Sequence, residues 1–218
     1  MATKANKTEY LQSNFFQLVV AITKDIPDMD EIEEIIAANQ DAIVIVDEAY
    51  IDYGGESALS LLPKYENLLV VRTYSKSRSM AGMRIGYAMG NKRLIQAMTD
   101  VKESINSYTM TRESIVLGAA SLADEEYFQE KKQMVVATRE RTKEELRRRG
   151  FEVLDSSANF LFAKPNSVDA GWLFEELKKE KIFVRHFNGE RIKDYLRISI
   201  GTDQQMDCLL QAIDRIMA

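Results

Sequence analysis

The 218-residue sequence predicts an α/β fold, with a partial large-domain sheet flanked by helices and a smaller C-terminal α/β domain. Two apolar runs, at 42–46 and 68–72, are rich in β-branched side chains and have the length of strands covered on both faces, which indicates a parallel sheet. After Gly150 the pattern changes to short strands alternating with helices. We therefore expect a separate N-terminal segment at 1–27, a larger domain at 28–149 and a smaller one at 150–218.

The elements of the larger domain follow from local patterns. Residues 10–26 fit a helical face and also a buried strand at 15–22, and both alternatives stay open. Pro27 and Asp28 are expected to open a helix that runs to Ala38, because acidic residues fill its first turns. A third strand should run antiparallel, since the connection that leads to it is short. The remaining expected elements are a short helical piece at 57–62, that strand at 84–88, and helices at 91–103, 113–122 and 124–149.

The smaller domain is expected to contain four strands and two helices. Gly150 should end the long charged helix that precedes it, as glycine commonly does after a helix C-terminus. The expected strands are 151–154, 159–163, 182–184 and 196–200, and the expected helices are 168–179 and 203–217.

Composition bounds the class of protein. Apolar residues make up 45% of the chain and charged residues 29%, as in ordinary soluble proteins. The net charge of -5 gives no reason to expect nucleic acid or an anionic membrane as a partner. A single cysteine, Cys208, excludes an internal disulfide, and together with the one histidine it cannot form a zinc cluster. No apolar stretch reaches the length of a bilayer span, so we expect a cytoplasmic protein.

Functional side chains follow both apolar runs, where each predicted strand ends. Lys76 comes soon after the second run and close to Arg84, and a nearby cation with partial desolvation would favour the neutral, nucleophilic amine. Asp47 follows the first run and could face a cationic ring nitrogen, with the phenol of Tyr50 near the same ring. The plainer alternatives are a solvated lysine, a carboxylate that accepts from its own loop, and a packing aromatic.

Two arginines are candidate anion receptors. Arg84 together with Ser75 could hold a phosphate, because a guanidinium matches phosphate oxygens, although a salt bridge to an acid would explain Arg84 as well. Arg197 interrupts an apolar strand-like stretch and could bind a substrate carboxylate; a strand with one face in water is the alternative.

Taken in order, these residues resemble the fold-type I pyridoxal-phosphate aminotransferases, and most closely the histidinol-phosphate aminotransferases. The segments that carry the resemblance are Asp47-Glu48-Ala49-Tyr50, Ser75-Lys76, Ala81 to Tyr87, and Leu196 to Gly201. The resemblance runs from about residue 30 to the C-terminus. Its order, residue types and intervals together are more specific than any single motif.

The resemblance implies roles for the candidate residues and for their partners. Lys76 would carry pyridoxal phosphate covalently, with Asp47 at the pyridine nitrogen and Tyr50 at the ring hydroxyl. Ser75 and Arg84 would bind the cofactor phosphate, and Arg197 would receive the substrate carboxylate. The implied reaction moves an amino group from histidinol phosphate, or a similar amino acid or amino alcohol phosphate, to 2-oxoglutarate. A homodimer is the implied assembly.

Relative to that family, the sequence is expected to be an N-terminally truncated member. The segment that should carry a cofactor-contacting asparagine falls near Leu18 to Ala21, where it is absent. Residues 28–149 would then be the remaining part of the cofactor-binding domain. Two alternatives stay open: a non-catalytic module that only dimerises or binds a partner, and a phosphate-binding module that uses Ser75 and Arg84 alone.

Overall fold

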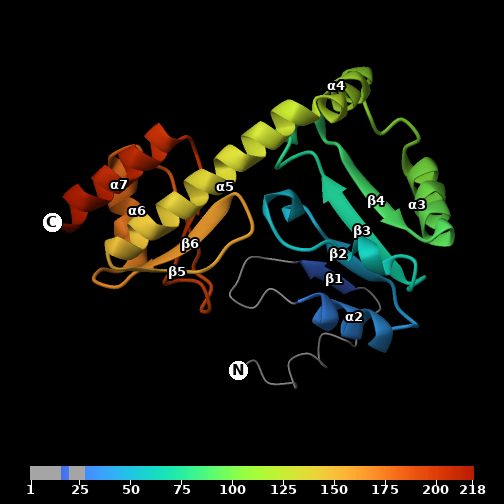
Figure 1. The fold of residues 1–218 in the computed structure, drawn as a ribbon, viewed down its shortest axis with the longest axis horizontal. Helices are drawn as coiled ribbons and strands as arrows, with labels where there is room; N and C mark the ends of the chain where they lie inside the picture. The colour runs from blue at the N-terminus through green and yellow to red at the C-terminus, as the bar shows by residue number, and fades with distance from the viewer. Residues whose placement is uncertain (1–15, 20–27) are drawn as a thin grey trace. The chain divides into compact units, whose positions relative to one another are not determined.

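The computed structural model describes residues 16–19 and 28–218, which form two compact units. The N-terminal unit extends to Glu125 and the C-terminal unit begins at Glu126. Each unit has its own four-stranded sheet with helices, so the predicted α/β class is confirmed (Figure 1).

The N-terminal sheet has the strand order β1-β2-β3-β4. The first three strands are parallel and β4 is antiparallel to β3, as predicted for the third apolar strand. The strand alternative for the ambiguous N-terminal stretch is confirmed for β1, whereas the rest of that stretch lies outside the described residues. The strands are β1 (Phe16–Val19), β2 (Val44–Asp47), β3 (Leu68–Thr73) and β4 (Gly86–Gly90).

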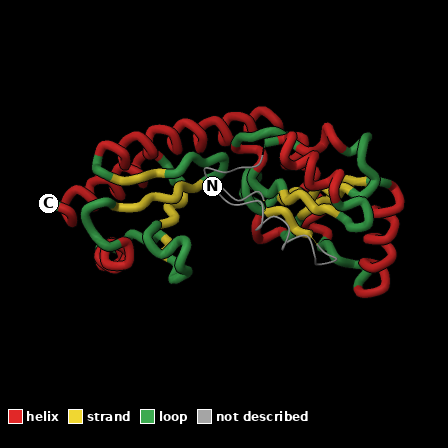
Figure 2. Tube along the Cα trace, turned by 90° about the horizontal axis from the view of Figure 1, so that it is seen from below, coloured by secondary structure: helices red, strands yellow, loops and turns green. Residues whose placement is uncertain are grey.

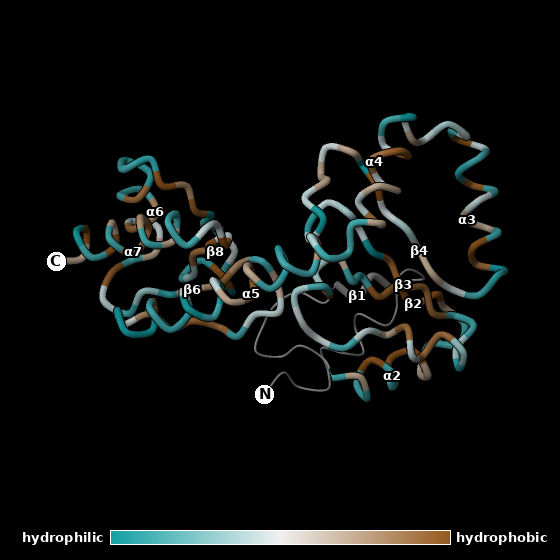
Figure 3. The backbone as a smooth tube through the Cα atoms, turned by 45° about the horizontal axis from the view of Figure 1, so that its top comes forward, coloured by the Kyte–Doolittle hydropathy of each residue, from teal (hydrophilic) through white to brown (hydrophobic). Residues whose placement is uncertain are grey.

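The core of this unit lies between the sheet and helix α2 (Met29–Ala38). Val44 and Val70 are fully buried against Ile32 and Ile36 of the helix, together with side chains of the short 3₁₀ helix η2 (Ala58–Leu61). Figure 3 shows β2 and β3 as the hydrophobic centre of the unit. The predicted cap of α2 is present, because the Asp28 carboxylate accepts from the Glu31 N–H at 2.8 Å.

Four further helical elements complete the N-terminal unit. Asn91 caps α3 and Thr111 caps α4, close to the predicted starts of these helices. A Cβ on Gly118 of α4 would lie 2.8 Å from Ile85 Cδ1, so the glycine lets α4 approach the start of β4. The elements are η1 (Ile51–Tyr53), η3 (Ala81–Met83), α3 (Lys92–Ile105) and α4 (Arg112–Ala123).

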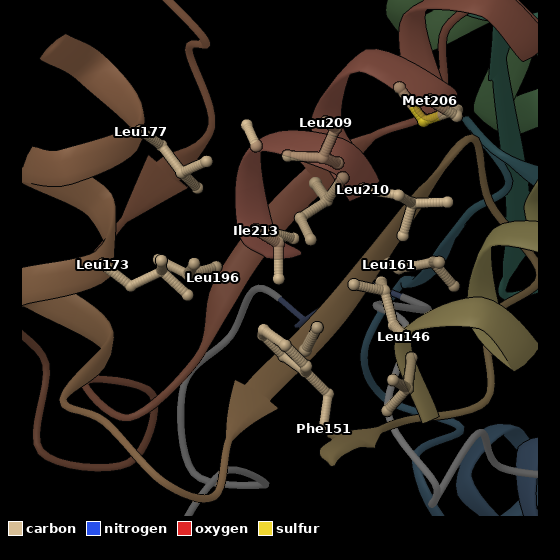
Figure 4. Close-up of a cluster of buried hydrophobic side chains, with 14 of the residues drawn as sticks. Leu146, Phe151, Leu161, Leu173, Leu177, Leu196, Met206, Leu209, Leu210 and Ile213 are labelled. Carbon is tan, nitrogen blue, oxygen red and sulfur yellow. The ribbon is translucent and has the colours of Figure 1, made fainter. Parts of the chain in front are cut away.

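The C-terminal unit is an antiparallel sheet of order β5-β6-β8-β7 packed with three helices (Figure 2). Its core joins Leu146 of α5, Leu173 of α6 and Ile213 of α7 to the strands (Figure 4). The elements are α5 (Glu125–Arg148), β5 (Phe151–Val153), β6 (Phe160–Pro165), α6 (Ala170–Lys179), β7 (Arg185–His186), β8 (Leu196–Ser199) and α7 (Asp203–Met217).

The division between the units falls at the start of α5, whereas the boundary expected from the sequence, residue 149, lies just after its end. Leu146 near the end of α5 belongs to the C-terminal core. The domain boundary expected at residue 149 stays a prediction.

The predicted strand at 182–184 is wrong. Lys181 adopts a positive φ of 62°, and the Ile182 N–H donates to the Leu177 carbonyl at 2.9 Å, so these residues close α6. Pairing with β8 begins only at Arg185, which lies opposite Arg197. The apolar character of the segment reflects packing, because Ile182 and Val184 lie against the C-terminal core.

Candidate active site

The candidate site of the N-terminal unit lies where two parallel strands end. Asp47 is the last residue of β2 and pairs in register with Val71 of β3, so the residues after Thr73 leave the sheet at the same edge as Asp47. Ser75 and Lys76 follow directly. The structure therefore brings the predicted carboxylate and amine to one edge of one sheet, where open α/β sheets bind their ligands.

Lys76 is half-buried and points its amine at an aromatic ring. Its Nζ lies 5.3 Å from the centroid of the Tyr50 ring, so amine and phenol share the site. Within the described residues, Lys76 forms no ion pair with an acid. The lysine is thus neither solvated on all sides nor neutralised by a carboxylate.

The turn that carries Lys76 is held by its neighbours. The Ser75 N–H donates to Thr73 Oγ1 at 3.0 Å, and the Ser79 N–H donates to the Lys76 carbonyl at 3.1 Å. The Ser77 hydroxyl donates to the Asp52 carboxylate. These bonds fix the backbone on both sides of Lys76, which limits the conformational freedom that a ligand would have to remove.

Among the described residues, one oxygen of Asp47 accepts a hydrogen bond and the other does not. Asp47 Oδ1 accepts from the Ala49 N–H at 3.0 Å, so the carboxylate does accept from its own loop. Within the described residues, Oδ2 accepts no hydrogen bond. Asp47 can therefore meet a cationic N–H with a carboxylate that its loop already orients.

Ser75 and Arg84 lie just beyond the end of the β3–β4 ladder, whose last pair is Thr73 with Gly86. The Tyr74 N–H donates to the Ile85 carbonyl at 3.1 Å, and Ser75 and Arg84 are the residues immediately beyond this pair. Arg84 is exposed, in the left-handed region at φ 55°, and donates to the Ala81 carbonyl at 3.0 Å. Among the described residues it has no acidic partner, so its other N–H groups can bind an anion.

A buried carboxylate network under this edge was not predicted. Glu48, 5% exposed, accepts from the Ala58 N–H at 2.7 Å, from Ser57, and from Arg72 Nε at 2.9 Å. Burial alone would lower the pKa of Arg72, but its hydrogen bond to Glu48 and the Glu48 charge raise it above the usual value. The network ties β2 to β3 beside Asp47. Its sequence signals are an acid after one buried strand and an arginine near the end of the next.

Tyr53 ends the short helix η1, which follows Asp47 and Glu48 along the chain. It is buried, and desolvation, with the charges of Asp52 and Tyr50, raises its pKa to about 12. The phenol therefore stays neutral at physiological pH. Tyr50 was predicted from the sequence as a site residue, whereas Tyr53 was not.

Arg197 belongs to the C-terminal unit, on β8. Its guanidinium contacts two aromatic rings, 5.0 Å from the centroid of Phe160 and 5.9 Å from that of Phe187. Its Nε is buried and has no hydrogen-bond partner among the described residues. A buried guanidinium N–H without an acceptor is costly, so this arrangement suits an anion supplied by a ligand. Arg197 and Ser199 lie on the more exposed face of β8, so the alternative of a strand with one face in water stays open.

Comparison with known proteins identifies the family. The model of the family "Aminotransferase class I and II" matches residues 23–213, which is most of the chain. The chain belongs to this aminotransferase family.

Two curated aminotransferases illustrate the similarity. The chain is 47% identical over 190 residues to the histidinol-phosphate aminotransferase of Clostridium acetobutylicum, covering 87% of this chain and 54% of that protein. It is 51% identical over 183 residues to the histidinol-phosphate aminotransferase of Lactococcus lactis subsp. cremoris, covering 84% of this chain and 51% of that protein. The chain thus spans about half the length of the curated aminotransferases it matches.

A solved aminotransferase shares the fold and holds the expected cofactor. The crystal structure of histidinol-phosphate aminotransferase from Sinorhizobium meliloti, in complex with pyridoxal-5'-phosphate, matches with a TM-score of 0.74 and 28% identity. The match covers 85% of this chain and 53% of that one. The aminotransferase-like fold expected from the sequence is confirmed.

Proposed function

We propose that this chain carries the lysine-bearing site of a pyridoxal-phosphate-dependent aminotransferase, which moves an amino group from histidinol phosphate, or a similar amino substrate, to 2-oxoglutarate. One observation carries the proposal: the half-buried Lys76 amine lies 5.3 Å from the Tyr50 ring centroid, at the sheet edge where Asp47 ends β2. Family membership agrees with this reading.

The described residues fit a phosphorylated, cationic ring. Arg84 and the Ser75 hydroxyl have hydrogen-bonding groups that no described residue satisfies, and these can bind a phosphate. No described residue donates to Asp47 Oδ2, so this oxygen can accept from a ring N–H. When bound, pyridoxal phosphate supplies an aldehyde carbon and a ring that takes up electrons from the substrate.

Each residue then has a defined task. Asp47 keeps the ring nitrogen protonated, because its negative charge stabilises the cation. Lys76 would hold the cofactor through its amine, and the same amine could move a proton from or to the substrate α-carbon. Tyr50 would donate to the ring oxygen. Arg197 would bind the carboxylate of the substrate through its guanidinium.

A covalent label tests this proposal. Mixing the protein with pyridoxal phosphate and reducing with borohydride should add one pyridoxyl group, which peptide mass spectrometry should find on Lys76. Lys76→Ala should lose the label. Lys64→Ala is the matched control, because Lys64 lies in the same unit and pairs with Glu33 on its surface, and it should keep the label. A label that survives Lys76→Ala would contradict the proposal.

The second candidate is the non-catalytic module left open by the sequence, although membership of the aminotransferase family does not favour it. Glutamate formation from histidinol phosphate and 2-oxoglutarate decides between the two. Turnover that Lys76→Ala abolishes supports the enzyme. Labelling at Lys76 without turnover supports the module. A homodimer and a cytoplasmic location remain part of the proposal; among the described helices, none has the length and apolar content needed to cross a bilayer.

A further inference from the structure

The turn that carries Lys76 is closed on itself and strained. The Met80 N–H donates to the Tyr74 carbonyl at 3.0 Å, and the Ser79 N–H donates to the Lys76 carbonyl at 3.1 Å. Ser79 has a left-handed φ of 56°, a conformation that residues other than glycine rarely adopt. Such backbone persists where the surrounding structure holds it. The turn therefore depends on contacts that the side chains at its tip make with the rest of the unit.

One such contact is a hydrogen bond from the Ser77 hydroxyl to Asp52 Oδ2. The two residues lie 25 positions apart, whereas a serine in a turn often bonds to backbone groups close to itself. The acceptor is a carboxylate oxygen and both side chains are half-buried, which makes the bond stronger than one between neutral groups in water. We call this contact the Ser77–Asp52 clasp.

The clasp lies directly beside the contact between Lys76 and Tyr50. Tyr50 is the N-cap of η1, and the Tyr53 N–H donates to the Tyr50 carbonyl at 3.0 Å, so Tyr50 and Asp52 belong to one short helical turn. Ser77 follows Lys76 along the chain. The clasp therefore joins the two segments at the place where the Lys76 amine lies 5.3 Å from the Tyr50 ring centroid.

A second side chain at the tip anchors the turn elsewhere. Arg78 donates to the Ser121 carbonyl of α4 at 2.5 Å, and its guanidinium lies 5.5 Å from the centroid of the Tyr74 ring. These two contacts tie the turn to α4 and to its own base. The clasp is the contact that ties it to the segment of Tyr50.

We infer that Ser77 and Asp52 are positioning residues, which set the direction of the Lys76 amine relative to the Tyr50 ring. Without the clasp, the turn keeps its backbone hydrogen bonds and the contacts of Arg78, but the Lys76 side chain loses its fixed place beside the ring. This positioning belongs to the chain alone. Its benefit for cofactor binding rests on the proposed function, because a reacting group that is displaced slightly loses much of its effectiveness.

Nuclear magnetic resonance of the full chain, prepared with isotope-labelled lysine, tests the positioning without cofactor. The CεH₂ signal of Lys76, assigned by its loss in Lys76→Arg, should be displaced by the Tyr50 ring, and Tyr50→Leu should remove the displacement. Ser77→Ala should move the signal most of the way to its place in Tyr50→Leu. Ser77→Thr keeps the hydroxyl and should restore the original signal. Ser104→Ala is the matched control, because Ser104 lies in the same unit and donates to Asp100 within its own helix.

A double-mutant cycle tests whether the two residues act through one bond. Asp52→Ala should move the Lys76 signal as Ser77→Ala does, and the double variant should move it no further, because each substitution removes the same hydrogen bond. Ser77→Ala is the primary variant, since the Asp52 charge also raises the pKa of Tyr53, and it decides alone if Asp52→Ala does not fold. Circular dichroism checks folding. A Lys76 signal that is unchanged in folded Ser77→Ala, or full additivity in the cycle, overturns the inference.

Cofactor binding separates this inference from the proposed function. The dissociation constant of pyridoxal phosphate, followed by absorbance, should rise by about tenfold in Ser77→Ala, because the lysine is less well preorganised, and should recover in Ser77→Thr. An original chain that takes no label at Lys76 contradicts the proposed function, and the resonance experiment still decides on the clasp. Labelling of the original chain with an equal dissociation constant in Ser77→Ala overturns the inference and leaves the proposed function in place.

Discussion

At the scale of single residues, Arg197 shows how a strand prepares an anion receptor. Its guanidinium carbon lies 5.0 Å from the centroid of the Phe160 ring and 5.9 Å from that of the Phe187 ring, so contacts with two aromatic rings restrict its orientation. The guanidinium therefore needs little further ordering when a carboxylate arrives. The loss of side-chain freedom on binding is the main free-energy cost that preorganisation reduces.

Phe187→Ala should weaken the binding of 2-oxoglutarate by about three- to tenfold, because one of the two ring contacts to Arg197 is lost. Isothermal titration calorimetry measures the affinity, and Arg197→Lys should bind more weakly still, since a lysine cannot form the planar contact. Phe183→Ala is the control, because Phe183 is an exposed phenylalanine of the same unit. Equal affinity in Phe187→Ala and the control would disprove this role.

Tyr53 predicts an alkaline limit to stability. Its pKa is raised from 10.0 to about 12 by burial and by the charges of Asp52 and Tyr50. The folded state therefore holds this proton more tightly than the unfolded state does, and the resulting stability is present below pH 10 and is lost as the pH rises toward 12. The urea midpoint of Tyr53→Phe should therefore fall less between pH 10 and pH 12 than that of the original chain. Urea midpoints of both proteins from pH 9 to 12 measure the difference, and parallel curves would contradict it.

The residues that end strands could be predicted, whereas those that meet through folding could not. Asp47 and Lys76 each follow an apolar run, and that position alone places them at the sheet edge. Glu48 acquires its role only when η2 returns beneath β2 and Arg72 arrives from β3. The local sequence does not predict these contacts of Glu48, because they depend on the register between two strands and on the path of a loop.

At the scale of elements, α5 and α7 are joined by charges along their surfaces. Arg149 donates to both oxygens of Asp214, at 2.7 and 2.9 Å, and Arg141 reaches Asp203 and Asp207. A bidentate arginine–carboxylate pair is the geometry in which a surface ion pair contributes measurably. It lowers the pKa of Asp214 through the Arg149 hydrogen bond.

Arg149→Gln should destabilise the C-terminal unit by up to about 1 kcal/mol, the range measured for partly exposed pairs. Because the pKa of Asp214 is lowered in the folded state, this stability is present above the unfolded value of 3.8 and is lost as the pH falls below it. The difference between the variant and the original chain in urea should therefore shrink from pH 7 to pH 3. Arg148→Gln, which removes only a pair with Glu145, is the control, and a difference that does not change with pH would argue against the Asp214 pair.

Helices and strands differed in how well the sequence located them. α6 and α7 lie close to their predicted ranges, because the apolar period and the capping residues Asp169 and Thr202 agree. The strand expected at 182–184 failed because apolar residues there pack on the core without pairing. Periodicity detects burial, and a segment this short can be buried without joining a sheet.

At the scale of the whole molecule, each unit has a core of its own. The N-terminal core centres on Ile36 and the strands above it, and the C-terminal core contains Leu177 and Leu196, all fully buried. The family could be predicted from the order of a few residues spread along the chain. The exposure of apolar side chains on α3 and α4, such as Val101 and Val116, could not, because an apolar residue in a helix has the same sequence signal whether it is buried or exposed.

Separate cores predict separate unfolding. Leu177→Ala should destabilise the C-terminal unit by about 2–5 kcal/mol, the usual cost of an unfilled cavity in a core, and should leave the N-terminal unit unchanged. Ile36→Ala should do the reverse. The only tryptophan, Trp172, lies on α6, so its fluorescence follows the C-terminal unit alone. Hydrogen exchange read by mass spectrometry follows both units, and equal loss of protection in both after either substitution would show that they unfold as one.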